Sequence, residues 1–159
     1  MFSGIELADV MERRLLLVDG HSAIHAWPEM KSVIRRGGGD ATEPARRMLV
    51  QALAAIADAT EVEVAVVFDG KGGRHEQVDE STTGIRVVFS GGKRSADGMI
   101  ERVVAKHGAE IAITVASNDR LVLDAAMAGG ADAMSIRGLQ QWVDSCDRDF
   151  RDRYGRYLR

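Results

Sequence analysis

The chain of 159 residues has 21 Lys and Arg against 24 Asp and Glu, a formal net charge of −3, and 45% hydrophobic residues. This composition excludes a disordered chain and a strongly basic nucleic-acid binder, and the length predicts one domain with a proper core. No apolar run approaches the roughly 18 residues that span a bilayer. The start lacks a secretory signal, and the single Cys146 excludes an internal disulfide. We therefore expect a cytoplasmic protein with no membrane partner.

The N-terminal half predicts a lead-in, two buried strands and one long helix. Residues 1–12 have mixed apolar spacing and predict a short helix or a loose lead-in. Residues 15–18 and 62–68 are short apolar runs without helical spacing, as in strands buried on both faces of a parallel sheet. Between them, residues 44–59 carry apolar side chains at three- and four-residue steps, which predicts an amphipathic crossover helix.

The C-terminal half repeats the order of strand and helix. Residues 70–84 are polar and contain glycine, so we expect a long flap or substrate loop. Ser95 is an expected N-cap for a helix that continues to residue 107. The other expected elements are strands at residues 85–89, 111–115 and 133–136, and helices at residues 121–128 and 138–154.

This repeated order predicts an α/β fold of three layers with right-handed crossovers. We expect the domain to cover residues 13–145, followed by a basic C-terminal helix or tail at residues 146–159. From residue 148 onward this tail carries five arginines against Asp149 and Asp152. Such a charge run either faces water or contacts RNA or a ribosome. The oligomeric state is left open.

Four aspartates, Asp19, Asp69, Asp97 and Asp119, form the main candidate site. Three of them follow predicted strands, and the carboxyl ends of parallel strands gather at one edge of a sheet. Taken singly, each has a structural explanation, as a helix-start acid or as part of a turn. Taken together, their carboxylates would repel one another unless a cation lay between them.

The candidate ligands are all hard oxygens, and no convincing Cys or His cluster accompanies them. This set favours Mg²⁺ or Mn²⁺ over zinc. Such an ion lowers the pKa of a bound water and neutralises charge on phosphate oxygens. The pattern therefore predicts hydrolysis of phosphodiesters by a metal-activated water, with either one or two ions.

Read in order, four blocks of the sequence resemble the YacP-like branch of the NYN ribonucleases. The blocks are Leu16 to Pro28, Val66 to Gly70, Val87 to Ser90 continued by Ser95 to Asp97 and Ile100 to Arg102, and Ser117 to Arg120. The resemblance runs from about Leu15 to Val143. It implies a PIN-like (NYN) domain with a central, mainly parallel sheet flanked by helices. It also implies a metal-dependent endoribonuclease that acts on messenger RNA, in some members on the ribosome.

By position, the resemblance implies that Asp19, Asp69, Asp97 and Asp119 are the catalytic and metal-binding acids. Ser117 and Asn118 match supporting polar groups. The first block departs from the family, which usually reads Asp-Gly-Tyr-Asn, because this chain has His21 and Ser22 in the last two places. Serine lacks the donor and acceptor capacity of the asparagine amide, so the orientation of Asp19 or of the substrate is in question.

Several further side chains have two readings. His21 either contacts a base or a phosphate or is a structural hydrogen-bonding residue, while His25 and Trp27 are expected to be structural. Glu101, four residues after Asp97 on one helix face, either supports the metal through water or is ordinary helix surface.

The candidates for holding the RNA backbone are Lys93, Arg94 and Arg120. Sequence choice would then come from unstacked bases of single-stranded RNA.

The main alternative is a binding module that keeps the fold and docks on RNA or the ribosome without cutting, with Ser22 as a sign of lost activity. The intact acids argue against it. A haloacid-type phosphatase also begins with a strand and an aspartate, but it needs a second acid two residues later. His21 occupies that position.

Overall fold

The computed structural model describes residues 13–38, 42–70, 77–80, 84–91 and 95–157, with the backbone alone for 77–80. The predicted lead-in at residues 1–12 and the predicted RNA-backbone residues Lys93 and Arg94 lie outside the described residues. None of the helices in the described part combines the length and the apolarity that crossing a membrane demands.

A six-stranded sheet in the order β3-β4-β2-β1-β5-β6 forms the centre of the domain. Five strands are parallel and β3 pairs antiparallel with β4 at one edge, which confirms the predicted mainly parallel sheet. Val18 pairs with Val66 of β2 and with Ala116 of β5, so these three strands end side by side. The strands are β1 (Arg14–Asp19), β2 (Glu63–Phe68), β3 (Gln77–Glu80), β4 (Arg86–Phe89), β5 (Ala112–Ala116) and β6 (Asp132–Met134).

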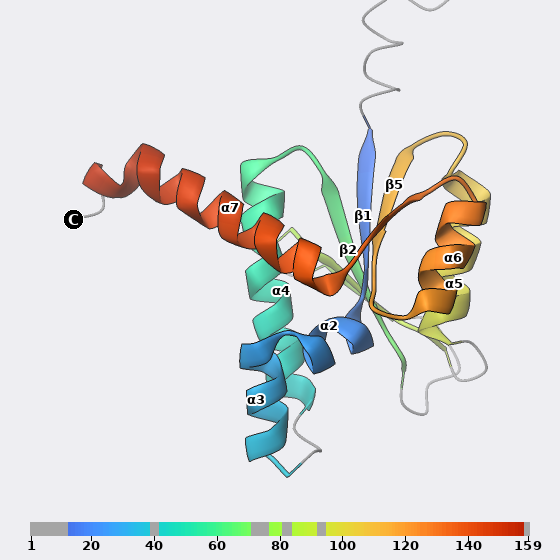
Figure 1. Ribbon diagram of the computed structural model, residues 1–159, viewed down its shortest axis with the longest axis horizontal. Coiled ribbons are helices and arrows are strands. Elements are labelled where there is room, and N and C mark those ends of the chain that lie inside the picture. Colours follow the sequence, from blue (N-terminus) through green and yellow to red (C-terminus); the bar gives the residue numbers. More distant parts are fainter. Residues whose placement is uncertain (1–12, 39–41, 71–76, 81–83, 92–94, 158–159) are drawn as a thin grey trace, which may run out of the picture.

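Helices cover both faces of the sheet and complete the three predicted layers (Figure 1). One face carries α2 (Gly20–Ala26), α3 (Pro28–Arg36), α4 (Thr42–Ala59) and α7 (Ile136–Tyr154), and the other carries α5 (Ala96–His107) and α6 (Arg120–Ala128). A short 3-10 turn, Gly155–Tyr157, follows α7.

Alternate residues of each strand supply two cores, because successive side chains point to opposite faces. Leu16 and Val18 join the core under α4, whereas Leu17 joins the core under α5 and α6. Each fully buried aliphatic side chain contributes about 1.5–3 kcal/mol, so the two cores fix the order of the strands and the edge at which they end. Trp27 is buried in the first core, which confirms its packing role.

The predicted loop over residues 70–84 is wrong in part, because β3 lies within it and pairs with β4. Its sequence, Gln-Val-Asp-Glu, has one apolar residue and therefore carries no buried-strand signal. Backbone pairing with β4 defines this edge strand. The remainder of the predicted flap, residues 71–76 and 81–83, lies outside the described residues.

The boundary between the last strand and the last helix also differs from the prediction. The expected strand at residues 133–136 ends at Met134, and α7 begins at Ile136 rather than at residue 138. Ser135 is the reason, because its Oγ accepts the N–H of Gly138 at 3.0 Å and so caps the helix. From there α7 runs without a break across the predicted domain boundary at residues 145 and 146.

Candidate active site

Asp19 ends β1 at the carboxyl edge of the sheet, and it is buried, with 4% of its surface exposed. Both of its carboxylate oxygens accept hydrogen bonds. Oδ2 accepts the Ser117 hydroxyl at 2.7 Å, and Oδ1 accepts the N–H of Ser22 at 3.4 Å as the N-cap of α2. A buried carboxylate held by two donors has a fixed orientation, which suits a group that must face a cation.

Ser117 and Ser22 form a directional chain of hydrogen bonds around this carboxylate. Because a hydroxyl has one proton, Ser117 Oγ, which donates to Asp19, must accept from Ser22 Oγ at 3.2 Å. Ser117 Oγ also accepts the N–H of Asp119 at 3.0 Å, and Ser22 Oγ accepts the N–H of Asn118 at 3.2 Å. Ser22, the departure from the family pattern, is therefore part of the network that orients Asp19.

Asn118 and Asp119 begin the segment that leads from β5 into α6. The side-chain oxygen of Asn118 accepts the N–H of Ile136 at 3.0 Å and ties this segment to the start of α7. Asp119 is the N-cap of α6, and its Oδ1 accepts the N–H of Leu121 at 2.9 Å. Asp119 is exposed, so its carboxylate remains accessible to an ion or a substrate from the solvent side.

Asp69 follows β2 directly and is connected to the helix that carries Asp97. Its Oδ1 accepts the N–H of Ala96, the first residue of α5, at 2.8 Å. Asp97 is the next residue, so the start of α5 is held beside the end of β2. This single contact brings two acids together that are 28 residues apart in the chain.

A residue without a predicted role, Ser90, fixes the backbone after Asp69. Ser90 is buried, its N–H donates to the carbonyl of Phe68 at 2.9 Å, and its Oγ accepts the N–H of Gly70 at 3.1 Å. A Cβ at residue 70 would overlap the carbonyl oxygen of Ser90, which explains the glycine by close approach rather than by a turn with positive φ. The sequence signal was weak, a serine at the end of one strand.

The charges of three aspartates act on the fourth, Asp97. Desolvation by the surrounding protein raises the pKa of Asp97, and the negative charges of Asp19, Asp119 and Asp69 raise it further, in that order. Carboxylates on four separate segments therefore meet at one edge of the sheet. His21 has the opposite effect on the pKa of Asp97, which places this ring near the same group.

His21 lies in the first turn of α2 and is exposed, with its ring 4.3 Å from the ring of His25. Desolvation by burial lowers the pKa of His25, and the charge of His21 lowers it further. A protonated His21 would partly balance the acids. His21 therefore lies near Asp97, and both of its expected roles, contact with a base or phosphate and structural hydrogen bonding, stay predictions.

The remaining predicted side chains, Glu101 and Arg120, are exposed on the two helices that begin at the site. Glu101 is exposed one turn beyond Asp97, and within the described residues it makes no hydrogen bond or ion pair with the site. Arg120, at the start of α6, pairs with Asp124 on the helix surface at 3.3 Å, and its side chain is 83% exposed.

The chemistry of these side chains suits a divalent cation. Among the residues that the structure describes, no three His, Cys, Asp or Glu side chains are already close enough to hold a metal directly. The donor set nevertheless fits Mg²⁺ or Mn²⁺, because all four groups are carboxylates and Mg²⁺ keeps several water ligands rather than filling an all-protein cage. The raised pKa of Asp97 shows negative charge that a cation would neutralise.

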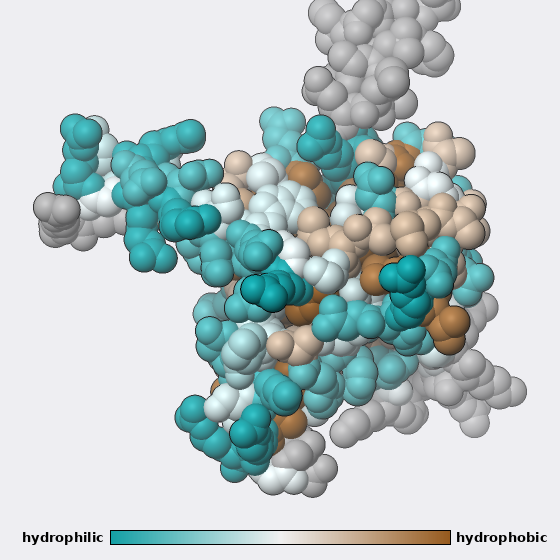
Figure 2. Space-filling view, in the orientation of Figure 1, coloured by the Kyte–Doolittle hydropathy of each residue, from teal (hydrophilic) through white to brown (hydrophobic). Residues whose placement is uncertain are grey.

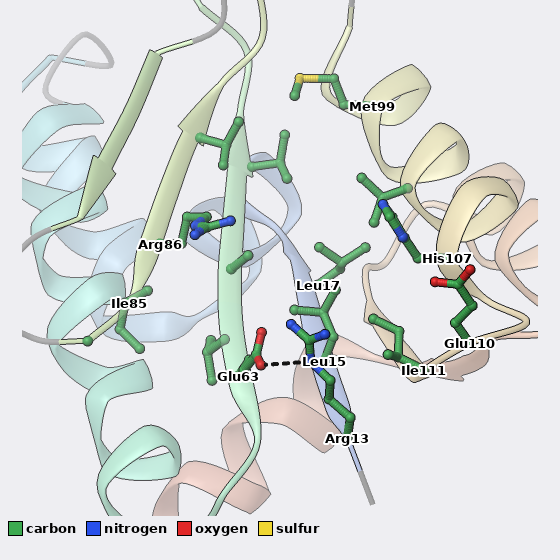
Figure 3. Close-up of a pocket in the computed structure, with 16 residues that line it drawn as sticks. Arg13, Leu15, Leu17, Glu63, Ile85, Arg86, Met99, His107, Glu110 and Ile111 are labelled. Carbon is green, nitrogen blue, oxygen red and sulfur yellow. Dashed lines mark hydrogen bonds and ion pairs between the residues drawn. The ribbon is translucent and has the colours of Figure 1, made fainter. Parts of the chain in front are cut away.

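A groove beside the sheet lies apart from this site. A groove of about 780 Å³ lies beside α5, on the face formed by Leu15, Leu17 and Val67, and the ion pair of Arg13 with Glu63 crosses it (Figure 3). None of the four aspartates lines it. The four acids therefore lie apart from this groove, at the carboxyl edge of the sheet.

Replacement of Ser117 by alanine is expected to destabilise the protein by about 1–3 kcal/mol and to lower kcat. The change leaves Asp19 Oδ2 without its donor and the Asp119 N–H without its acceptor. Urea unfolding and steady-state cleavage of RNA would measure the two effects. Ser32→Ala, which removes an exposed bond from Arg36, is the matched control and should change stability by less than about 0.5 kcal/mol. Unchanged stability and kcat in Ser117→Ala would contradict the positioning role.

Comparisons with known proteins give one consistent result. The family described as YacP-like NYN domain matches residues 16–157. The chain is 30% identical over 135 residues to the protein YacP of Bacillus subtilis (strain 168), which covers 84% of this chain and 77% of that protein.

Two crystal structures of Rae1 (YacP) from Bacillus subtilis share the fold. One superposes with a TM-score of 0.73 and 31% identity, covering 90% of this chain and 80% of that chain. A mutant form superposes with a TM-score of 0.74 and 29% identity, covering 91% and 82%. The family match, over residues 16–157, spans all four segments that carry the aspartates.

Proposed function

Because the chain belongs to the family of YacP-like NYN domains, in which the domain is of the PIN-like nuclease type, we propose that it is a metal-dependent endoribonuclease. The observation that carries the proposal is the placement of the four aspartates: β1, β2 and β5 end side by side at one edge of the sheet, and the bond from Ala96 to Asp69 holds the start of α5 there. The raised pKa of Asp97 agrees with this placement. A phosphodiester brings further negative charge. An edge that concentrates carboxylates can accept it only together with a cation.

The proposed cation is Mg²⁺ or Mn²⁺, held by Asp19, Asp69, Asp97 and Asp119. When bound, such an ion supplies an activated water and neutralises charge on the phosphate oxygens. The chain's own residues would do the positioning. Ser117 and Ser22 fix the orientation of Asp19, the start of α5 fixes Asp69, and His21 provides a nearby ring that can contact a base or a phosphate.

The proposed substrate is RNA, with single-stranded messenger RNA as the class implied by the family resemblance and the ribosome as the place of action in some members. Sequence-specific contacts to RNA are made mostly to unstacked bases of single-stranded regions, which fits this class of substrate. Arg120 follows Asp119 at the start of α6, and its guanidinium is exposed. In this proposal it would contact a phosphate of the RNA backbone, which positions the substrate without reading its sequence.

A metal-activated water attacks phosphorus without help from the neighbouring ribose hydroxyl. We therefore expect an RNA with a single 2′-deoxy sugar at the cut site to be cleaved at a rate within about tenfold of the all-ribose substrate. The products should carry a 5′-phosphate and a 3′-hydroxyl, and a chelator should stop the reaction. Complete loss of cutting on the deoxy substrate would instead indicate transesterification through the 2′-hydroxyl.

One observation favours a second candidate, an RNA-binding module that does not cut. Ser22 stands where the family usually has asparagine, and serine lacks the donor and acceptor capacity of that amide. Titration with Mg²⁺ or Mn²⁺ distinguishes the two. A nuclease should gain thermal stability and cleavage together as the metal is added, whereas the binding module should retain RNA without cutting it at any metal concentration.

A further inference from the structure

Helix α7 carries one stripe of apolar side chains at three- and four-residue steps along its whole length. In its first half the stripe consists of Leu139, Val143 and Cys146, which are buried in the core beside α4. The same stripe continues with Phe150 and Tyr154, and with Tyr157 in the following 3-10 turn, which are 53%, 44% and 76% exposed. A surface that packs on the domain thus extends past the edge of the domain.

We call residues 147–157 the C-terminal arm. Every residue from 147 to 154 is exposed, and Figure 1 shows this end of α7 extending past α4 and away from the sheet. Figure 2 shows the arm as a projection with a mainly hydrophilic surface in this view. Phe150 and Tyr154 contact each other, with ring centroids 5.1 Å apart, and about half of each side chain is exposed.

The arm continues a helix whose first half is docked on the domain, but its own apolar residues have no such packing. Most helical stability comes from packing of an apolar face, so a partner on the arm would stabilise it further. Exposed apolar surface rimmed by charged residues is the usual mark of an interaction site. The pattern of charge beside the stripe indicates which partner fits.

Charged residues of opposite sign flank the stripe on both sides. Asp147 and Arg151 lie on one side and Asp149 and Arg153 on the other, about 60–100° round the helix from Phe150. The first pair is centred one residue before Phe150 and the second pair one residue after it. In an antiparallel two-fold pairing centred on Phe150, the same sides of the two helices face each other. Asp147 would then lie opposite Arg151 of the other copy, and Asp149 opposite Arg153.

We propose that the C-terminal arm is a homodimerisation surface, on which the aromatic stripe of a second copy packs antiparallel. Within the described residues neither aspartate forms an ion pair inside its own helix, so both are available to the second copy. RNA fits the arm less well. Its four arginines are interspersed with three aspartates on both sides of the stripe, so no face is purely basic.

The first test is sedimentation velocity of the full chain over a range of protein concentrations. The wild type should form a dimer, and Phe150→Glu should be monomeric with an unchanged circular dichroism spectrum, because residue 150 is exposed in the monomer. Met127→Glu is the matched control, since Met127 is 48% exposed on α6, and it should dimerise like the wild type. A wild type that is monomeric throughout, or a dimer that survives Phe150→Glu, overturns the proposal.

The second test uses reversed charges to examine the antiparallel register. Asp147→Arg and Arg151→Asp should each weaken self-association at least about tenfold, because like charges then oppose one another twice in each homodimer. An equal mixture of the two variants should dimerise again, because both contacts become attractive. Failure of the mixture to associate overturns the register.

RNA would be the partner instead if the wild type is monomeric and binds single-stranded RNA, and if Phe150→Glu loses that binding. Neither test depends on nuclease activity.

Discussion

Replacing Asp69 by asparagine is expected to lower metal-supported RNA cleavage by about 100-fold or more while leaving the protein folded. The asparagine carbonyl can still accept the N–H of Ala96, so the start of α5 should stay beside the end of β2. The change removes a negative charge and one oxygen donor for a divalent ion. Single-turnover cleavage at saturating Mg²⁺ would measure the loss.

The control for Asp69→Asn is Asp58→Asn, which removes the same charge from an exposed position on α4. It should cleave like the wild type, which separates a local effect from a change in net charge. Melting curves should show that both variants unfold cooperatively. If Asp69→Asn retains full metal-supported activity, Asp69 does not belong to the site.

Replacing Asp97 by asparagine is expected to lower cleavage about as much as Asp69→Asn does. It should also raise the melting temperature of the metal-free protein. Desolvation and three neighbouring carboxylates raise the pKa of Asp97, so its ionised form is disfavoured in the folded state. The folded protein therefore binds this proton more tightly than the unfolded chain, and metal-free stability falls as pH rises through the folded pKa. At neutral pH an asparagine amide carries no charge, so the variant does not bear the free-energy cost of an ionised Asp97 in the folded state.

The measurement is thermal unfolding at neutral pH with chelator and then with Mg²⁺. The wild type should gain stability when Mg²⁺ is added, whereas Asp97→Asn should start higher and gain less. Glu101→Gln, one turn further along α5, removes a charge outside the set that acts on Asp97 and should retain cleavage within a few fold. A metal-free Asp97→Asn protein that melts lower than the wild type would show that the acids do not repel one another.

The parallel sheet and the edge that carries the acids could be predicted because their signals are local. Buried strands such as Val64 to Phe68 are continuous apolar runs, and an aspartate after each run must lie at the same edge once the strands are parallel. Edge strand β3 has no such signal, because pairing with β4 defines it and its side-chain pattern does not.

The hydrogen-bond network of the site could not be predicted in the same way. The proximity of Ser22 to Ser117, 95 residues later, results from the pairing of β1 with β5 and from the cap that Asp19 provides to α2. Ser90 is likewise a single buried serine whose partner, Gly70, is 20 residues earlier. Short polar side chains give no periodic pattern, so their roles emerge only after the strands are in register.

Manganese-soaked crystals of the wild-type protein test the central claim most directly, because the anomalous signal of Mn²⁺ locates the ion without reference to activity. We expect a peak among the carboxylates of Asp19, Asp69, Asp97 and Asp119, and its loss in Asp69→Asn. Ordered density for all four side chains with no ion among them, at a concentration of Mn²⁺ that supports cleavage, would contradict the account.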